Sequence, residues 1–379
     1  MRIFFFTAHF PPYGSGGEIV AGRLVASLVE RGHDLLVATS HGSRDLPDYE
    51  EWQGAAVHRF GLWDAVARPD PGAIAAGRRW LADLKRGFAP DVVHLNTISP
   101  VDLFHWQTLG AGRAPTVVTL HGMLDPRFCR PLRPDTVFDH ALRRADGLVA
   151  CSAAVLADVL EVLPSAAARC HLVYNGSPTP EGRLGALSAT PPRLLCLGRL
   201  VPEKGVETAL AAFARVRATL PAARLVVGGD GPERARLSRL AAELGVADAV
   251  DFAGAVAPAR VPELLASSSL VLLPTLSEGF GLVALEAALH ERPVVASRVG
   301  GLGEVVADGL TGLLVAPGDA AGMAAAAIAL LTDEERCRRF GLTARRRAEA
   351  LFGVDRQVDG VVEVYQALVL QARRVREAS

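Results

Sequence analysis

The sequence predicts an α/β protein of two domains, each built on a parallel β-sheet. Its 379 residues exceed what one hydrophobic core usually accommodates. Short apolar runs recur along the chain without alternating polar residues, and a longer segment with helical periodicity follows each run. Runs of this kind are typical of strands that are covered on both faces, as in a parallel sheet with crossover helices.

The apolar runs divide into two groups. The first group predicts strands at residues 3–7, 35–39, 92–95, 116–120 and 147–151. Turn-forming residues then gather at residues 174–180, and a charged irregular stretch follows. The second group predicts strands at residues 193–197, 224–227, 250–253, 270–274, 293–297 and 312–315. We therefore predict a first domain over 1–178, a linker over 179–192, a second domain over 193–354 and a final helix over 355–379.

The composition excludes several classes of protein. Forty Lys and Arg against 41 Asp and Glu give a formal net charge of −1, too little for a dedicated nucleic-acid-binding protein. No apolar run approaches the roughly 20 residues that span a bilayer. The five cysteines are scattered and form no C-x-x-C pair, as expected for buried thiols in a reducing compartment. We expect a cytoplasmic protein, and the Ala-, Arg-, Leu- and Val-rich composition is compatible with a GC-rich bacterial gene.

Two loops of the first domain follow predicted strands and carry candidate binding residues. Gly14, Gly16 and Gly17 precede a helix expected over residues 19–31, where backbone amides can approach a phosphate or a sugar hydroxyl. A tight turn without a ligand explains this loop equally well, and its spacing does not match the G-x-G-x-x-G fingerprint of dinucleotide sites. His121 directly follows a predicted strand. Its position at the carboxyl end of that strand favours a functional role more strongly than an isolated histidine would.

A cationic loop follows the first strand of the second domain. Arg199 and Lys204 lie between Gly198 and Gly205, so that both side chains can converge on one phosphate. The guanidinium would act as a fork and the ammonium as a point charge. The residue order differs from G-x-x-x-x-G-K-[ST], which excludes a Walker-type phosphate loop. The alternative is a solvated loop with two unrelated cations.

The stretch SEGFGLVALEA, residues 277–287, places two glutamates eight positions apart around a Gly-Phe-Gly turn. If a helix begins at this turn, Glu278 lies in the loop and Glu286 about two turns into the helix. The backbone amides at the turn then form an anion site at the positive end of the helix. Carboxylates on both sides suit an anion that joins two hydroxyl-rich groups, as in a nucleotide sugar. The alternative is a pair of surface glutamates, against which the apolar residues between them argue.

At these residues the sequence resembles the family 4 retaining glycosyltransferases with the GT-B fold. The motifs that carry the resemblance occur in the family's order over nearly the whole chain: FPPYGSGGE, VVTLHG, ADGLVACS, VYNGS, GRLVPEKG, VVGGDGPER, DFAGAV, LLPTLSEGFGLVALEA, PVVASRVGGLGEVV and DGLTGLLVAPGD. The resemblance implies two Rossmann-like domains whose parallel sheets face a central cleft, with the donor bound mainly to the second. It also implies that the last helix packs back on the first domain and that no metal or other cofactor is required.

The resemblance assigns a role to each candidate side chain. Arg199 and Lys204 resemble the pair that neutralises the donor diphosphate. Glu278 resembles the carboxylate that touches the hydroxyls of the donor sugar, and Glu286 the acceptor for the ribose hydroxyls. His121 resembles the first-domain histidine beside the transferred sugar. These five residues are the predicted catalytic and donor-binding side chains.

Backbone groups complete the implied donor site. They belong to Gly16, Gly17, Val256, Phe280, Gly281 and Leu282. The two glycines of the first domain resemble a loop that closes over the phosphates, and the valine resembles the residue whose backbone contacts the base. The other three residues offer amides to the phosphate or the sugar. The segment after Gly254 lacks the charged side chain that many members carry, so uridine and guanosine both remain open, with uridine favoured as the commoner donor.

The implied mechanism places most of the catalytic effect on the leaving group. Breaking the anomeric C–O bond develops negative charge on the β-phosphate, which Arg199, Lys204 and the helix amides stabilise. Retention implies that the acceptor hydroxyl attacks from the leaving-group side and that the departing phosphate takes its proton. Glu278 is then a sugar ligand and not a nucleophile, and no protein base is required.

The acceptor stays open among small molecules, lipid-linked glycans and polysaccharides, and the oligomeric state is unknown. Asp125, Arg127 and Arg130 are candidates for lining the acceptor site. A predicted helix over 74–88 has an apolar and a cationic face, which could rest on an anionic membrane. Ordinary packing on a sheet explains both faces too, and we favour it. The two faces consist of Ile74, Leu81, Leu84 and Phe88, and of Arg78, Arg79, Lys85 and Arg86.

Rival functions follow from the same two-domain plan. A nicotinamide-dependent oxidoreductase would share it, but the failed fingerprint and the Thr39-Ser40 end of the second strand, where an acid would bind ribose, argue against this class. A non-catalytic nucleotide-sugar-binding protein would keep the donor loops and lose turnover. An epimerase or phosphorylase with the GT-B fold would release a different product from the same site.

Overall fold

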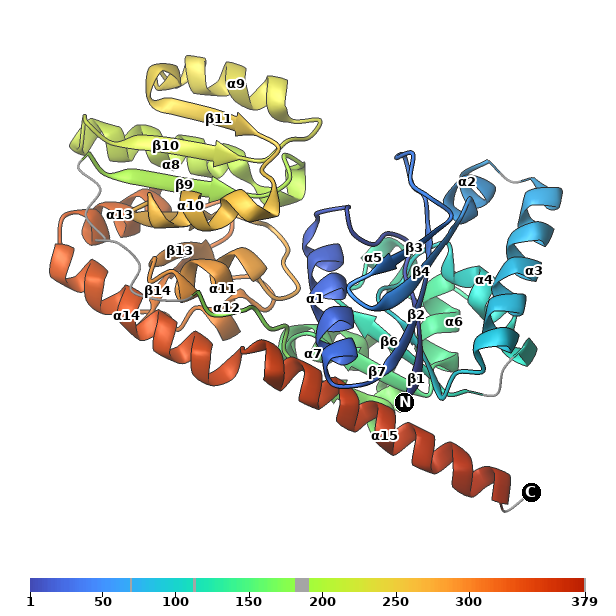
Figure 1. Cartoon of the computed structure of the whole chain (residues 1–379). Coiled ribbons are helices and arrows are strands. Elements are labelled where there is room, and N and C mark those ends of the chain that lie inside the picture. The colour runs from blue at the N-terminus through green and yellow to red at the C-terminus, as the bar shows by residue number, and fades with distance from the viewer. Residues whose placement is uncertain (69, 112–113, 181–190, 378–379) are drawn as a thin grey trace. The chain divides into compact units, whose positions relative to one another are not determined.

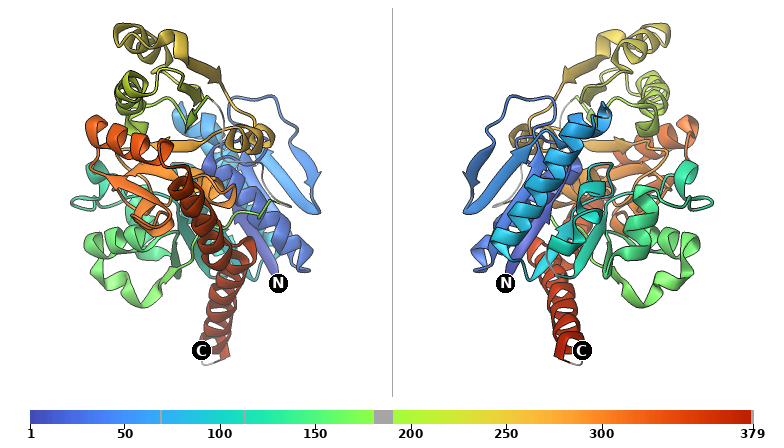
Figure 2. Two further views of the ribbon diagram at one scale, coloured as in Figure 1. Left: turned by 90° about the vertical axis from the view of Figure 1, so that its left-hand side faces the viewer. Right: turned by 90° about the vertical axis from the view of Figure 1, so that its right-hand side faces the viewer.

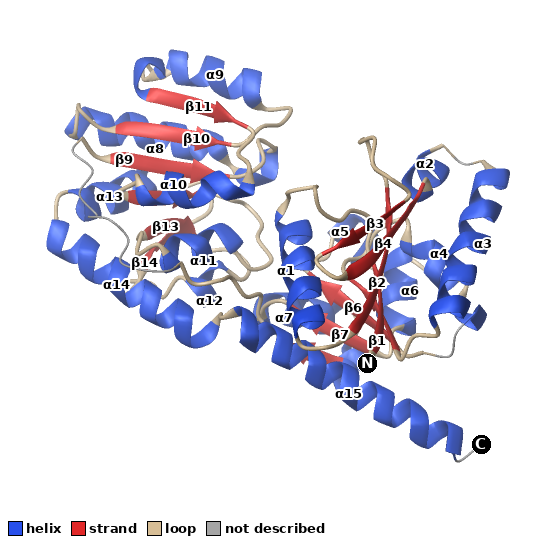
Figure 3. Ribbon diagram, in the orientation of Figure 1, coloured by secondary structure: helices blue, strands red, loops and turns tan. Residues whose placement is uncertain are grey.

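The computed structural model describes residues 1–68, 70–111, 114–180 and 191–377, and the chain forms two compact units (Figure 1). The first unit comprises Met1–Gly176 with Val354–Ser379, and the second comprises Ser177–Gly353. In each unit, strands form a central sheet and helices lie on both sides of it (Figure 3). The predicted linker, residues 179–192, falls mostly outside the described residues.

The first unit is built on an eight-stranded sheet with the order β3-β4-β2-β1-β5-β6-β7-β8. Its strands are β1 (Arg2–Phe6), β2 (Asp34–Ser40), β3 (Tyr49–Trp52), β4 (Ala55–Phe60), β5 (Val92–Leu95), β6 (Thr116–Leu120), β7 (Gly147–Ala150) and β8 (Cys170–Leu172). Neighbouring strands are parallel, except that β3 pairs antiparallel with β4. The sequence did not predict β3, β4 or β8, because none of them contains a continuous buried run. Strands β3 and β8 lie at the edges of the sheet, and β4 alternates between buried and half-buried positions.

Helices cover both faces of this sheet. They are α1 (Gly16–Glu30), α2 (Leu62–Ala67), α3 (Pro71–Phe88), α4 (Asp102–Trp106), α5 (Pro126–Cys129), α6 (Val137–Arg144), α7 (Ala153–Val162) and α15 (Val354–Glu377). On one face, α1 and α15 share a hydrophobic core with Phe5 and its neighbours. On the other, the ring of Phe88 at the end of α3 lies 6.4 Å from that of Phe4. Successive strand residues point to opposite faces, so the Phe4-Phe5 pair anchors both layers.

The last helix belongs to the first unit. Arg31 at the end of α1 bonds to Asp355 at 2.9 Å and also pairs with Asp359, both on α15. Tyr365 is fully buried, and its hydroxyl bonds to Nδ1 of His94 on β5. The helix runs along the unit and its final turns extend past the sheet (Figure 2). The described helix spans Val354–Glu377, where the sequence predicted a final helix over 355–379.

The second unit has a six-stranded parallel sheet with the order β11-β10-β9-β12-β13-β14. Its strands are β9 (Arg193–Leu197), β10 (Arg224–Gly228), β11 (Val250–Gly254), β12 (Leu270–Leu273), β13 (Val294–Ser297) and β14 (Gly312–Val315). Its helices are α8 (Val206–Thr219), α9 (Arg234–Glu243), α10 (Val261–Ala266), α11 (Leu282–Leu289), α12 (Leu302–Val305), α13 (Ala320–Leu331) and α14 (Glu334–Leu351). Residues of α8, α9 and α13 form a core with one face of the sheet.

In each sheet, the direction in which successive strands are added changes beside one central strand. In the second unit, β9 lies between β10 and β12, so the chain turns to opposite sides after β9 and after β12. In the first unit, β1 lies in the same way between β2 and β5. Loops that leave such a switch point in opposite directions open a crevice at the carboxyl ends of the strands, where open α/β sheets bind ligands. Functional residues are therefore expected in the loops after β1 and β5 and after β9 and β12.

The cationic face predicted for residues 74–88 is wrong at one position. Lys85 on α3 is buried, with an exposed fraction of 2%, and its ammonium lies 2.8 Å from Nδ1 of His105 and 3.0 Å from Oγ1 of Thr108. Burial lowers the pKa of Lys85 to about 7. Arg78, Arg79 and Arg86 stay exposed. Among the described residues, no helix is both long and apolar enough to cross a membrane.

Candidate functional site

The two loops at the switch point of the second unit bring opposite charges together. Lys204 lies in the loop after β9 and Glu278 in the loop after β12, 74 positions later. The Lys204 ammonium donates to Oε2 of Glu278 at 2.7 Å, and the two side chains keep 29% and 22% of their surface exposed. Because an ammonium carries three donors, Lys204 can bond to a ligand oxygen while it holds Glu278.

Arg199 in the same loop is exposed to solvent. Within the described parts of the chain it forms no ion pair, so its guanidinium is available for an anionic ligand. The loop after β9 therefore presents two cations, one held by a carboxylate and one open to solvent. Excess positive charge of this kind, next to a short loop at a strand end, suits a phosphate group.

Backbone contacts hold these loops rigidly. The amide of Leu200 donates to the carbonyl of Asp230 at 2.9 Å, and that of Gly198 donates to Gly228 at the same distance. A Cβ atom on Gly229 would lie 1.8 Å from the carbonyl oxygen of Gly198, so only glycine permits this approach. The cationic loop is thus fixed against the loop after β10, and its side chains start from a defined backbone.

A second pair of glycines supports the glutamate loop. A Cβ atom on Gly300 would lie 1.8 Å from the carbonyl oxygen of Glu278, and one on Gly301 would lie 2.3 Å from that of Gly279. The amide of Gly301 also donates to the carbonyl of Glu278 at 3.2 Å. The sequence interpretation assigned no role to these glycines. Their signal was present, since two adjacent glycines follow the predicted strand 293–297 closely.

The expected helix start at the Gly-Phe-Gly turn is observed. Helix α11 begins at Leu282, directly after Gly281, whose φ of 101° is in the left-handed region that favours glycine. Glu286 lies on α11 and is half-buried. The ring of Phe280 is buried against Phe352, with centroids 5.4 Å apart, so only its backbone faces the loop.

Val256, the predicted base contact, follows β11 at the same edge of the sheet. It is half-buried, and its side chain packs near Gly228, since a Cβ on that glycine would lie 3.1 Å from Cγ2 of Val256. Its side chain therefore packs against the end of β10, and its backbone groups are the ones that could contact a base.

At the switch point of the first unit, Asn96, which the sequence did not predict, contacts the predicted residues Gly17 and His121. The amide nitrogen of the Asn96 side chain lies 3.5 Å from the carbonyl oxygen of Gly17, and its Oδ1 lies 3.2 Å from Nε2 of His121. Asn96 follows β5 and His121 follows β6. The sequence interpretation named Gly17 and His121 but missed Asn96. A polar residue directly after the buried strand 92–95 was the signal that could have found it.

His121 is neutral at physiological pH. Its ring is largely shielded from solvent, and burial lowers its pKa to about 4. The same cause lowers the pKa of His94 on β5 to about 3. Oδ1 of Asn96 can only accept, so Nε2 of the neutral His121 ring donates to it and Nδ1 is left to accept one hydrogen bond from a ligand. The ring carries no charge into the site.

Helix α1 begins earlier than the sequence predicted. It starts at Gly16 and not at residue 19, so Gly16 and Gly17 form its first turn. The predicted glycine loop is therefore the helix start itself, with Ser15 in the position that precedes it. The first backbone amides of α1 have no partner within the helix, so they are available to a ligand at the carboxyl end of β1.

The residues predicted to line the acceptor site are occupied by local contacts. Asp125 caps α5 by accepting from the amide of Arg127 at 2.8 Å, and the Arg127 side chain returns to Asp125 at 2.6 Å. Arg130 forms ion pairs with Asp158 and Glu161. Each of the three charged side chains thus has a local partner, and no contact among the described residues assigns them to a ligand.

The described residues contain no cluster of metal-ligating side chains, and their cysteines form no disulfide. In the described parts of the chain, no three His, Cys, Asp or Glu side chains are grouped so that they could hold a metal ion. The cysteines are free thiols, and four of the five are buried. Burial raises the pKa of Cys196 to about 12, which makes its thiol unreactive.

Comparison with known proteins agrees with this geometry. Residues 14–179 match the family description Glycosyltransferase Family 4, and residues 185–347 match Glycosyl transferases group 1. The glycogen synthase of Mycobacterium tuberculosis is 30% identical over 404 residues, which cover 97% of this chain and 95% of that protein.

Solved structures show the same fold. Sucrose-phosphate synthase from Thermosynechococcus elongatus superposes with a TM-score of 0.79 at 22% identity, over 100% of both chains. The Anabaena protein HepE in complex with UDP-glucose gives a TM-score of 0.78 at 22% identity, over 96% of this chain and 99% of that one. Sequence and fold agree, and the chain belongs to the family 4 glycosyltransferases of the GT-B fold.

Proposed function

We propose that the chain is a retaining, metal-independent glycosyltransferase that transfers a sugar from a UDP-sugar to a hydroxyl group of an acceptor. The observation that carries this proposal is the 2.7 Å contact between Lys204 and Glu278 at the switch point of the second unit. A sugar diphosphate needs a cation for its phosphate and an acceptor for its sugar hydroxyls, and this pair offers both side by side. The UDP-glucose complex of HepE supports UDP as the nucleotide.

The proposed chemistry begins at the leaving group. The bond between the anomeric carbon and the β-phosphate oxygen breaks, and its electron pair stays on that oxygen. Lys204 and Arg199 stabilise the new negative charge, and the amides of Gly281 and Leu282 add the positive end of α11. Since these charges come from the protein, the leaving group requires no metal ion.

Retention follows from attack on the side of the departing phosphate. The acceptor oxygen bonds to the anomeric carbon, and its proton passes to the phosphate oxygen, so the products are the glycosylated acceptor and UDP. Glu278 serves as a hydrogen-bond acceptor for the sugar and not as a nucleophile. Its contact with Lys204 supports this assignment, because a carboxylate held by an ammonium is a weaker nucleophile.

The other candidate residues complete donor recognition in the proposal. Glu286 on α11 accepts from the ribose hydroxyls, and the backbone of Val256 contacts the base. In the first unit, the neutral imidazole of His121 bonds to the transferred sugar, while the start of α1 at Gly16 and Gly17 approaches the phosphates. Free cysteines support a reducing location such as the cytoplasm. Membership of a glycosyltransferase family leaves the nicotinamide-dependent alternative without support.

Thermal unfolding in the presence of UDP, GDP, ADP and NAD tests the donor. A ligand that binds only the folded state raises the melting temperature, and we expect UDP to raise it most. Stabilisation by NAD alone, or by none of the four, would contradict the proposal. The anomeric configuration of a product, read by NMR coupling constants, tests retention, and turnover in EDTA tests metal independence.

A further inference from the structure

A group of aromatic rings lies at the carboxyl edge of the first unit, beside its switch point. His9 follows β1, Trp63 follows β4, and Tyr13 lies in the loop between β1 and α1. Strands β1, β2 and β4 are parallel neighbours, so their carboxyl ends lie at one edge. We call His9, Tyr13 and Trp63 the aromatic cluster. It shares this edge with Gly17, Asn96 and His121, which follow β1, β5 and β6.

Within the aromatic cluster, the ring of His9 contacts each of the other two rings, and all three rings stay partly accessible. The ring centroid of His9 lies 4.9 Å from that of Tyr13 and 5.5 Å from that of Trp63. Trp63 exposes 36% of its surface, and the other two rings are half-buried. Large rings normally turn into the core, because burial of their apolar area stabilises the fold. A joined platform of rings at a ligand-binding edge therefore calls for a ligand that covers it.

Polar contacts hold the platform in place. The Tyr13 hydroxyl donates to the carbonyl of His41 at 2.6 Å and accepts from the amide of Arg44 at 3.0 Å. A Cβ atom on Gly42, whose φ is 63°, would lie 2.4 Å from the Tyr13 hydroxyl oxygen. The loop after β2 is thus closed tightly over one side of the platform. The rings are preorganised and would lose little freedom on binding.

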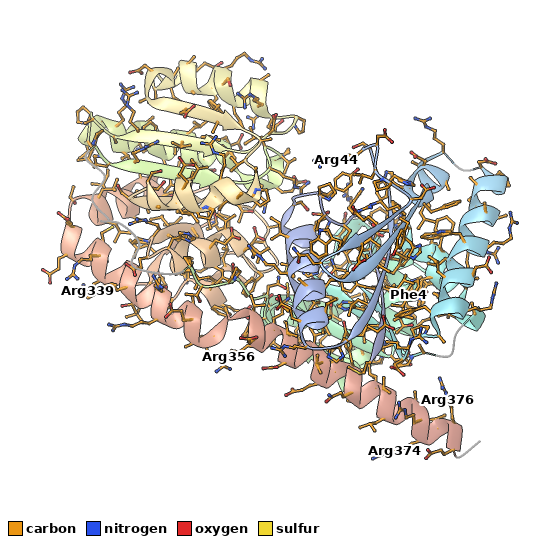
Figure 4. The ribbon with its side chains drawn as sticks, viewed as in Figure 1. Phe4, Arg44, Arg339, Arg356, Arg374 and Arg376 are labelled. Carbon is orange, nitrogen blue, oxygen red and sulfur yellow. The ribbon has the colours of Figure 1, made fainter. Side chains whose placement is uncertain are left out.

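One cation accompanies the rings. The guanidinium of Arg44 lies 4.8 Å from the ring centroid of Tyr13 and donates to the carbonyl of Pro12 at 3.0 Å. Figure 4 labels Arg44 on the loop that follows β2. Of the carboxylates nearby, Asp48 pairs with His41, and Arg44 has no carboxylate partner among the described residues. Its charge is therefore left for a ligand.

We propose that the aromatic cluster and Arg44 form the acceptor site, and that the acceptor is a sugar-like polyol ring with an anionic substituent. The apolar face of such a ring, where C–H groups point, packs on aromatic rings, and its hydroxyls remain outward. Arg44 binds a phosphate or carboxylate on the ring as a planar fork. This inference rests on the proposed function, because the hydroxyl that attacks must lie near His121.

Binding of matched rings to the full chain tests the inference directly. Saturation-transfer NMR with UDP present would compare glucose with glucose 6-phosphate, and myo-inositol with a myo-inositol phosphate. We expect each phosphorylated ring to bind about tenfold more tightly than its neutral partner. Arg44→Gln should remove this difference. Trp63→Ala should weaken binding of all four rings, and Trp63→Phe should restore most of it because a ring is kept.

Controls separate this inference from the proposed function. Arg78→Gln, which removes an exposed arginine of α3, should change no ring affinity, and every variant should keep the UDP-induced rise in melting temperature. If UDP stabilises the protein but neutral and phosphorylated rings bind equally, or no ring binds, the acceptor inference is wrong and the proposed function stands. Unchanged affinities in both Arg44→Gln and Trp63→Ala would also overturn the inference. If UDP does not stabilise even the unmodified chain, the proposed function itself fails.

Discussion

The two units share the order of their central parallel strands but present opposite chemistry at their carboxyl edges. In the second unit, the switch point carries two cations, one of them bound to Glu278, on loops that glycines press together. In the first unit, the equivalent position carries Asn96, a neutral His121 and aromatic rings. Strand order decides where a ligand binds, whereas the loop residues decide which ligand it is.

The two lysines of the chain show the same contrast between the units. Only two of the 40 basic residues are lysines, Lys85 in the first unit and Lys204 in the second. Lys204 is partly exposed and bonded to a carboxylate, whereas Lys85 is buried against His105 and Thr108 without one. Lys204 thus keeps a carboxylate partner and contact with solvent, whereas burial lowers the pKa of Lys85 to about 7.

The largest effect is expected for Lys204→Met. Loss of the ammonium removes leaving-group stabilisation, so kcat should fall about a hundredfold. Steady-state kinetics of UDP release would measure this, with the surface substitution Arg339→Met as a matched control. Lysine-selective ¹³C labelling adds a direct check, because UDP-glucose should shift the Lys204 signal and leave that of Lys85 in place. A variant with unchanged kcat would place the leaving group elsewhere.

Gly300→Ala should have the next largest effect. The new methyl group would lie 1.8 Å from the Glu278 carbonyl oxygen at a φ of 47°, so the glutamate loop must move. We expect kcat/KM to fall by about tenfold or more, since the displaced Glu278 loses its alignment with the donor sugar. Gly303→Ala is the matched control, because its Cβ would have only an ordinary contact at 3.9 Å. Equal losses in both variants would show general destabilisation and not a supporting role for Gly300.

Lys85 should make stability depend on pH in the alkaline range. Its pKa is lowered from 10.5 to about 7, so between these values the unfolded chain binds more protons than the folded one. The free energy of unfolding should therefore rise with pH in this window, by up to about 1.4 kcal/mol per pH unit. Urea unfolding at several pH values would measure the rise, and Lys85→Met should flatten it. The same slope in the variant would assign the effect to other groups.

The smallest effect is expected for His121→Ala. One hydrogen bond from a neutral imidazole contributes about 1 kcal/mol, so kcat should fall about fivefold while UDP affinity stays unchanged. Because its pKa is about 4, the rate profile should contain no inflection from His121 between about pH 5 and 8. His140→Ala on α6 provides a control. Weaker UDP binding in the His121 variant would contradict the division of roles between the two units.

Much of the fold could be predicted because it is encoded locally. The strands at 92–95, 116–120, 193–197 and 312–315 have the predicted bounds. Strands β5 and β6 are buried at every position, and most of the residues in all four strands are apolar, which leaves a recognisable apolar run in the sequence. The antiparallel hairpin of β3 and β4 has no such run, because β3 is an edge strand with the polar sequence YEEW.

The sequence by itself determined which apolar runs belong to each of two sheets, and which loops after them carry cations, glutamates or histidine. Only the tertiary structure decided which of these residues meet. Lys204 and Glu278 are 74 positions apart and touch, Asn96 joins Gly17 to His121, and Lys85 turns inward from a helix whose other cations stay exposed. Periodicity reports how a segment lies relative to its own axis, whereas contacts between segments depend on how the sheet brings distant strand ends together.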